Sequence, residues 1–194
     1  MKILCDTCSI LMVMRIAPDM LTDEKYGCFT IQEVREEIIR QQKFKDKYPW
    51  RHGFKDKIRC IPNSEIINND FVNQHLDVVN LLIENNTINK KTVRLFDLSP
   101  VDRRFIACAL SFGHRVSTGD NDIKDIASQE FSKTFKGSIS PLGMVNTWIR
   151  KGLIDWSDEL HGYVEDWNRT EEAPQPKHQK KEYRKLTGFK YPGS

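Results

Sequence analysis

Residues 1–11 read MKILCDTCSIL, and the order of residue types in this stretch decides the fold. A short apolar run, residues 3–5, ends at Asp6, and apolar residues resume a few positions later. A short apolar run followed directly by a polar residue is typical of a strand buried on both faces, as in a parallel sheet. The residues that follow favour a helix over 9–14. The stretch therefore predicts a buried strand that presents Asp6 at its carboxyl end.

The rest of the chain repeats this alternation of short strands and helices. Further strands are expected at 28–31, 58–61, 114–117 and 137–140. Helices are expected at 32–42, 64–84, 99–112, 122–127 and 141–151. Such alternation predicts an α/β fold with a mostly parallel sheet, whose functional groups gather at the carboxyl ends of the strands.

Length and composition limit the classes of protein that the chain can belong to. Its 194 residues are 39% hydrophobic and 29% charged, enough apolar material for one core with a solvated surface. No apolar run reaches 18 residues, and an acid interrupts the apolar start, so neither a membrane span nor a secretory signal is expected. The five cysteines are an odd number without framework spacing. They predict reduced thiols and a cytoplasmic protein.

The charge is unevenly distributed along the chain. The net charge is +3, but residues 40–59 carry +6 and residues 174–194 carry +5, which leaves −8 for the remainder. An acidic body with two basic, aromatic-bearing segments suits a protein that binds a polyanion. The two basic segments are explained equally well as solvated parts of the surface. We expect a domain over 1–152 with a basic insertion at 40–75. Residues 153–194 form an extension, whose tail after Trp167 is expected to be extended or flexible.

Several acids are expected at one rim of the sheet. Asp6 follows the first strand, Asp120 and Asp122 follow the strand at 114–117, and Asp102 lies in the first turn of the helix that leads into that strand. Carboxylates roughly 5 Å apart repel by about 3 kcal/mol per pair at an effective dielectric near 20. Such a cluster needs a cation, and oxygen ligands favour Mg²⁺ or Mn²⁺ over zinc.

Each of these acids also has an ordinary structural explanation. Asp102 lies three residues after Ser99, where an acid completes a helix cap. Asp120 and Asp122 fit turn and cap positions, and Asp6 fits the cap of the first helix.

The order of these motifs resembles that of the PIN-domain ribonucleases, a group that includes many toxins of toxin–antitoxin pairs. The resemblance spans about residues 1–150 and is carried by ILCDTCSIL, TIQEVREEI, LSPVDRRFIACALSFG and VSTGDNDI, in that order. It implies a three-layer α/β/α sandwich with a central, mostly parallel sheet.

The resemblance also implies a set of site residues. The family's metal-site acids fall on four positions, with Asp122 as a fifth: Asp6, Glu37, Asp102 and Asp120. Glu33 and Glu36 are alternatives to Glu37 in the same motif. Thr7 and Thr118 match the supporting hydroxyl positions, although capping explains them equally well.

The activity that the resemblance implies is metal-dependent hydrolysis of RNA phosphodiester bonds by an endoribonuclease holding Mg²⁺ or Mn²⁺. Toxin status, an antitoxin partner and a homodimer are expectations of the same kind. Basic residues would steer the RNA backbone: Lys43, Lys45, Arg51, Lys55 and Arg103. Stacking on bases is expected of Tyr48, Trp50 or Phe54, although packing within the protein explains such aromatics more often.

Two other functions compete with this one. Cys5 and Cys8 form a CxxC pair, which suits thiol redox chemistry, but Cys5 lies within the strand and not at a helix amino terminus. A PIN-like fold that only binds RNA or a protein is the other alternative.

Overall fold

The centre of the fold is a parallel sheet of three short strands in the order β2-β1-β5, in a computed structural model that describes residues 2–170 and 175–192. The strands are β1 (Ile3–Cys5), β2 (Cys28–Phe29) and β5 (Arg115–Ser117). Leu4 pairs with Phe29 on one side and with Val116 on the other. All three residues of β1 are buried, as the apolar run predicts for a central strand. The expected α/β class with a parallel sheet is confirmed, although the sheet is small.

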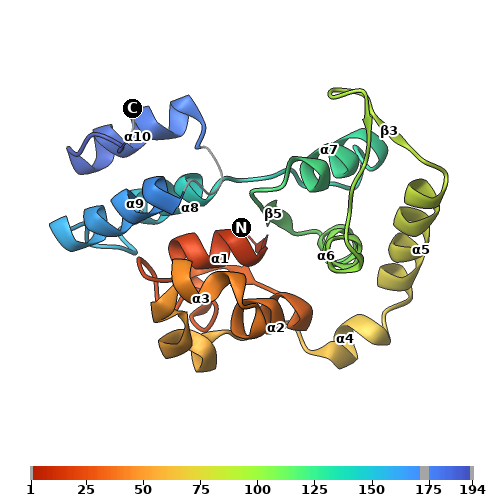
Figure 1. The fold of residues 1–194 in the computed structure, drawn as a ribbon, viewed down its shortest axis with the longest axis horizontal. Coiled ribbons are helices and arrows are strands. Elements are labelled where there is room, and N and C mark those ends of the chain that lie inside the picture. Colours follow the sequence, from red (N-terminus) through yellow and green to blue (C-terminus); the bar gives the residue numbers. More distant parts are fainter. Residues whose placement is uncertain (1, 171–174, 193–194) are drawn as a thin grey trace.

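Helices make up most of the remaining structure (Figure 1). They are α1 (Thr7–Val13), α2 (Gln32–Arg40), α3 (Lys43–Lys47), α4 (Asn63–Ile67), α5 (Asp70–Glu84), α6 (Pro100–Ser111), α7 (Asn121–Glu130), α8 (Pro141–Arg150), α9 (Asp158–Thr170) and α10 (Lys177–Thr187). Two 3₁₀ segments span Glu24–Tyr26 and Pro49–Lys57, and a small antiparallel hairpin joins β3 (Ile88–Asn89) to β4 (Arg94–Leu95).

The structure departs from the predicted elements in three places between residues 58 and 140. The stretch 58–61 is irregular and forms no strand. The Ile61 amide donates a hydrogen bond to the Thr30 carbonyl at 2.8 Å. The predicted helix 64–84 divides into α4 and α5 because Asn69 caps a new helix. Its side-chain oxygen accepts the amides of Phe71 and Val72 in the first turn of α5. At 137–140 a single parallel bridge joins Ser138 to Val116.

The C-terminal segment differs most from its prediction. An extended tail was expected there, but α10 is helical and packs on α8. Tyr183 is completely buried, with Trp156 and Tyr191 packed edge-on against its ring. The Asn146 side chain of α8 donates to the Gln179 carbonyl of α10 at 2.9 Å. A few aromatic contacts replace the regular apolar spacing on which the prediction depended.

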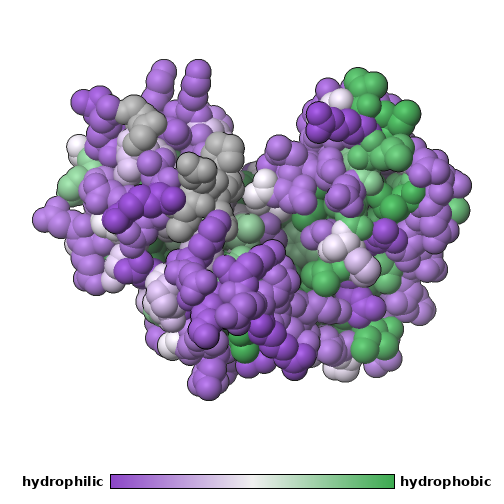
Figure 2. All heavy atoms as spheres, in the orientation of Figure 1, coloured by the Kyte–Doolittle hydropathy of each residue, from purple (hydrophilic) through white to green (hydrophobic). Residues whose placement is uncertain are grey.

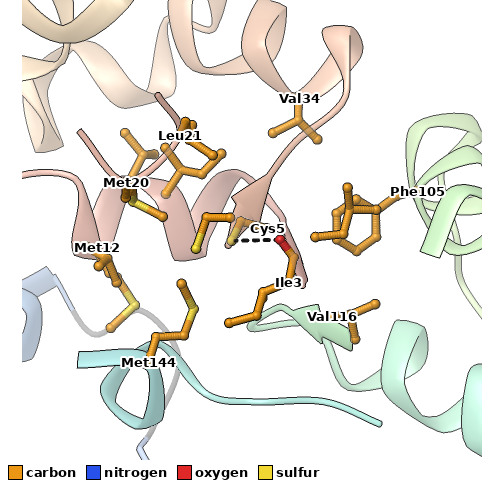
Figure 3. Packing of buried hydrophobic residues seen from close by; sticks show 14 of the residues in the cluster. Ile3, Cys5, Met12, Met20, Leu21, Val34, Phe105, Val116 and Met144 are labelled. Atoms are coloured by element: carbon orange, nitrogen blue, oxygen red, sulfur yellow. Dashed lines mark hydrogen bonds between the residues drawn. The ribbon is translucent and has the colours of Figure 1, made fainter. Parts of the chain in front are cut away.

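The core surrounds β1 (Figure 3). Met12 comes from α1, Phe105 from α6 and Met144 from α8, and each is almost fully buried against the strand. Unbranched methionines fill irregular space well, which suits a strand packed by helices of different direction. This core holds the carboxyl end of β1 in a fixed position.

One part of the surface is unusually apolar. Seven large hydrophobic side chains of the described chain are exposed, and they all lie within 67–95: Ile67, Phe71, Val78, Leu81, Ile88, Val93 and Leu95. They belong to α4, α5 and the β3–β4 hairpin with its turn, and hydrophobic atoms gather over these elements on the right of Figure 2. Among the described residues, no helix has both the length and the apolarity that a membrane crossing requires.

Candidate active site

Asp6 is fixed at the rim where β1 and β5 end side by side. Its amide donates to the Ser117 carbonyl at 3.0 Å, which continues the β1–β5 ladder by one residue. Its Oδ1 accepts the Ser9 amide of α1 at 2.7 Å, and its Oδ2 accepts the Gly119 amide at 3.2 Å. The carboxylate therefore caps α1 and also ties the first strand to the loop after the last one.

A pocket of about 250 Å³ opens at this rim, and four of the five predicted acids line it: Asp6, Glu37, Asp102 and Asp120. They come from the end of β1, from α2, from the first turn of α6 and from the loop after β5. Thr7, Cys8, Lys43 and Lys47 complete the polar lining, and Phe44 and Phe105 are among its apolar residues. Acids up to 114 positions apart in the sequence thus share one small cavity.

Glu37 is the member of its motif that faces the pocket. Its Oε2 accepts the Thr7 hydroxyl at 2.5 Å, and its Oε1 accepts the Gln41 side chain at 2.9 Å and lies 3.6 Å from the Lys43 ammonium. The two alternatives are engaged elsewhere: Glu33 pairs with an arginine of α6 at 3.0 Å, and Glu36 with one of its own helix at 3.2 Å. Neither alternative lines the pocket.

Asp102 combines its structural role with a place in the pocket. Its Oδ2 accepts the amide of Ser99 at 2.9 Å and the hydroxyl of Ser99 at 2.6 Å. The Asp102 amide in turn donates to the Ser99 hydroxyl at 3.2 Å, which completes the capping box that the sequence suggested. The ordinary explanation of this acid is therefore correct, and it also fixes the carboxylate against the pocket.

Asp120 caps α7 through an Oδ1 bond from the Asp122 amide at 2.7 Å. Desolvation raises the pKa of the Asp120 carboxyl, and the negative charges of Asp102 and Asp122 raise it further. The pKa of Asp6 is raised as well, because burial outweighs its hydrogen bonds to Thr118, Ser9 and Gly119. Both shifts mean that the pocket disfavours uncompensated negative charge.

Asp122, the predicted fifth acid, lies outside the lining of the pocket. Its Oδ1 accepts the Asn89 side chain at 3.2 Å and its Oδ2 accepts the Asp97 amide at 3.1 Å. These bonds attach α7 to the hairpin and to the segment after it. The structure gives this carboxylate a structural role.

The two predicted hydroxyls both bond the acids. Thr7 is buried and donates to Glu37, while the Thr118 hydroxyl accepts the Asp120 amide at 2.9 Å and also bonds Asp6. They position the carboxylates of the pocket, as expected for supporting residues.

The predicted RNA-contacting basic residues are distributed differently from the expectation. Lys43 lines the pocket, and Lys45 and Lys55 are exposed. Arg51 is buried, with its guanidinium bonded to the carbonyls of Ile38, Phe44, Tyr48 and Gln41. Arg103 bonds the Leu98 carbonyl and the Asn80 side chain. Arg51 is corrected to a structural residue, because its donors are used inside the protein. Arg103 is half-buried and uses only part of its guanidinium in these bonds, so its contact with RNA stays a prediction.

The aromatic residues of the insertion pack mainly on one another. Trp50 lies edge-on to both Tyr48 and Phe54, and Tyr48 is buried. The guanidinium of Arg15 lies 5.6 Å from the Trp50 ring. The packing explanation therefore holds for Tyr48, whereas base stacking by the half-buried Trp50 or Phe54 stays a prediction.

Lys47 lines the pocket but was missing from the predicted set. It lies four residues after Lys43 on α3, so both side chains leave the same helix face. That spacing was the available sequence signal.

A divalent cation suits this donor set chemically. The pocket offers carboxylate oxygens from four elements. Two of its acids, Asp6 and Asp120, have raised pKa values that a bound cation would lower. In the described residues, however, no three His, Cys, Asp or Glu side chains are grouped closely enough to hold one ion. The oxygens of Asp6, Asp102 and Asp120 bond capping amides and hydroxyls instead.

The cysteine pair does not have the environment of a redox site. Burial raises the pKa of the Cys5 thiol, and its neighbour Cys28 contributes in the same direction. A redox thiol needs a lowered pKa and access to solvent. Cys8 lines the pocket, half-buried, beside Asp6 and Thr7.

Comparisons of the chain with protein-family models, with curated proteins and with solved structures gave no match.

Proposed function

We propose that this protein is a Mg²⁺- or Mn²⁺-dependent endoribonuclease of the PIN type that hydrolyses RNA phosphodiester bonds. The observation that carries the proposal is the shared pocket of Asp6, Glu37, Asp102 and Asp120 at the carboxyl end of β1. These are the four positions at which the resemblance to the family puts its metal-site acids. The finer fold in this proposal is the three-layer α/β/α sandwich, supported by the small parallel sheet with helices packed around it.

Asp6, Asp102 and Asp120 are the residues that would hold the cation, each from a different part of the pocket lining. Their oxygens bond capping groups in this structure, so binding requires these side chains to turn toward one point. When bound, a divalent cation lowers the pKa of a coordinated water and neutralises charge on the phosphate and on the leaving oxygen. Thr7 and Thr118 keep the carboxylates in position through the bonds described above. Lys43 and Lys47 orient the phosphate from α3, and Glu37 holds the Lys43 ammonium beside the acids.

The surroundings of the pocket support an enzyme over a binding module. An inactive relative would retain the fold without needing desolvated carboxylates in one cavity, which cost free energy while uncompensated. The thiol-redox alternative is disfavoured by the raised pKa of Cys5.

The resemblance extends the proposal to partners. A toxin of this type would be held by an antitoxin, and it would form a homodimer. The exposed apolar surface over 67–95 is the surface of the described chain on which either partner would bury apolar area.

The test is cleavage of labelled single-stranded RNA by the purified protein with Mn²⁺ or Mg²⁺. We expect cleavage that EDTA abolishes and that the metals restore. Asp6→Asn and Asp120→Asn should each remove activity while circular dichroism shows a folded protein. Cys8→Ser is the matched control, since Cys8 lines the same pocket without being an oxygen donor, and it should retain activity. Full activity in EDTA contradicts the proposal. So does a result in which Cys8→Ser loses activity and Asp6→Asn keeps it.

A further inference from the structure

A second cavity, of about 470 Å³, shares a loop with the candidate active site. Asp120 of the loop 118–121 lines the acidic pocket, whereas Thr118, Gly119 and Asn121 line the second cavity. The other walls come from β5, from α8 and the residues before it, and from α7 and α10. These elements face one another in the upper half of Figure 1, and Figure 2 shows the molecule hollowed between α7 and α10.

The second cavity is basic, in contrast to the pocket beside it. Arg115, Lys124, Arg150 and His178 line it, and Glu182 is its one acid among the described residues. Three permanent cations and one carboxylate give a net charge of +2 with the histidine neutral. Arg150 is ion-paired with Glu182, and Arg115 donates to the Ser138 carbonyl. Lys124 and His178 have no ion pair or side-chain hydrogen bond in residues 2–170 or 175–192, so they are available to a ligand.

The amides at the start of α8 contribute little to anion binding here. The Leu142 amide donates to the Gln175 side chain at 3.0 Å, and the Gly143 amide to the Ser140 hydroxyl at 3.1 Å. Recognition therefore depends on the basic side chains. The volume of the second cavity is in the range of small-molecule sites, so this cavity has room for a nucleotide and not only for an ion.

We propose that this cavity binds the phosphodiester of the RNA nucleotide adjacent to the one that is cut. The inference rests on the proposed nuclease function. A single RNA strand crossing the loop 118–121 would place one phosphate at the acidic pocket and its neighbour at the cations of the cavity. Because a pocket of four carboxylates repels the rest of the backbone, the strand needs positive charge close to the cut, and this cavity supplies it. Lys124 and His178 contact the phosphate, and Arg150 approaches it.

The experiment measures binding, not cleavage, so that it does not depend on metal. A fluorescein-labelled single-stranded RNA is titrated with protein in EDTA at several salt concentrations, with fluorescence anisotropy as the readout and a gel to show that the RNA is intact. Lys124→Gln should weaken binding about fivefold and reduce the slope of log K against log salt by about 0.7, the value for one lost phosphate contact on a single strand. Lys133→Gln is the control, because Lys133 is exposed just beyond α7 and lines neither cavity.

A second variant should change RNA affinity in the opposite direction. Glu182→Gln removes the one acid that the described residues contribute to the cavity lining, and it releases Arg150. RNA should therefore bind more tightly, with a steeper salt slope. Its control is Glu165→Gln, an exposed acid of α9. Thermal melts followed by circular dichroism verify that every variant is folded.

The outcomes separate this inference from the proposed function. The inference is wrong if Lys124→Gln and Glu182→Gln bind RNA as their controls do. It is also wrong if the wild-type protein does not bind RNA. If the protein cleaves RNA in a metal-dependent way but these variants bind RNA as the wild type does, the phosphodiester site is contradicted and the nuclease function is not. Binding that depends on the cavity, without metal-dependent cleavage, supports the phosphodiester site and contradicts the nuclease.

Discussion

The Thr7 hydroxyl donates to Glu37 Oε2 at 2.5 Å, and this bond joins the first turn of α1 to α2 in the lining of the acidic pocket. The bond fixes Glu37, which itself holds the Lys43 ammonium at 3.6 Å. One hydroxyl thus positions both a carboxylate and a cation of the candidate site.

Removing this hydroxyl should affect both stability and activity. Thr7→Val keeps the shape but loses a bond to a charged group, so the free energy of unfolding should fall by about 2 kcal/mol in urea denaturation. RNA cleavage should fall about tenfold, as for a residue that orients a ligand of the site. Thr7→Ser is the control that keeps the hydroxyl. Equal loss of activity in both variants would show that the bond to Glu37 is irrelevant to the site.

Asp120→Asn should make the metal-free protein more stable at pH 7 while removing activity. The folded protein raises the pKa of Asp120, so this group stabilises the fold below its unfolded pKa, and that contribution is lost as pH rises through the folded pKa. An amide has no such loss, so the stability of the variant should depend less on pH between about 4 and 7. Urea denaturation in EDTA across this range measures it. A variant less stable than wild type at pH 7 contradicts the expected sign.

Divalent cations should stabilise the wild-type protein. A ligand that binds only the folded state at 100 times its Kd adds about 2.7 kcal/mol, which raises the Tm of a chain of this size by about 5 to 10 °C. We expect this shift with Mn²⁺ or Mg²⁺ in differential scanning fluorimetry. It should be absent in Asp120→Asn and reversed by EDTA in the wild type. Equal shifts in both proteins would place the cation elsewhere.

Arg51 should matter for stability and not for RNA binding. Its guanidinium bonds the Ile38 carbonyl at 2.9 Å and the Phe44 carbonyl at 3.0 Å inside the basic insertion. Arg51→Ala leaves these carbonyls without a donor and should cost about 3 kcal/mol in denaturant unfolding. Arg51→Lys should not restore stability, because an ammonium cannot reproduce the planar fork. Arg59→Ala, at an exposed position, should change stability by less than about 0.5 kcal/mol.

The sequence was most informative where local rules apply. The apolar run before Asp6, the capping box at Ser99 and Asp102, and the parallel sheet follow from burial and capping alone. The shared pocket was predictable because parallel strands end at one rim.

The sequence was least informative where long-range contacts decide the structure. Asp122 carries the same charge as its neighbour Asp120, and only the position of Asn89 directs it to the hairpin. Arg51 looks like a surface cation until Ile38 and Phe44 surround it. The basic cavity joins β5, α7, α8 and α10, whose residues follow no common spacing.

The hydrogen bond from the Gly119 amide to Asp6 connects positions 113 residues apart. Because synthesis runs from the amino end, Asp6 is made long before β5, the strand that will lie beside it. Under the proposed function, a nascent polypeptide has no complete active site until β5 has been translated and has paired with β1. The mRNA that is being translated is therefore not exposed to a complete active site on its own nascent chain before that point.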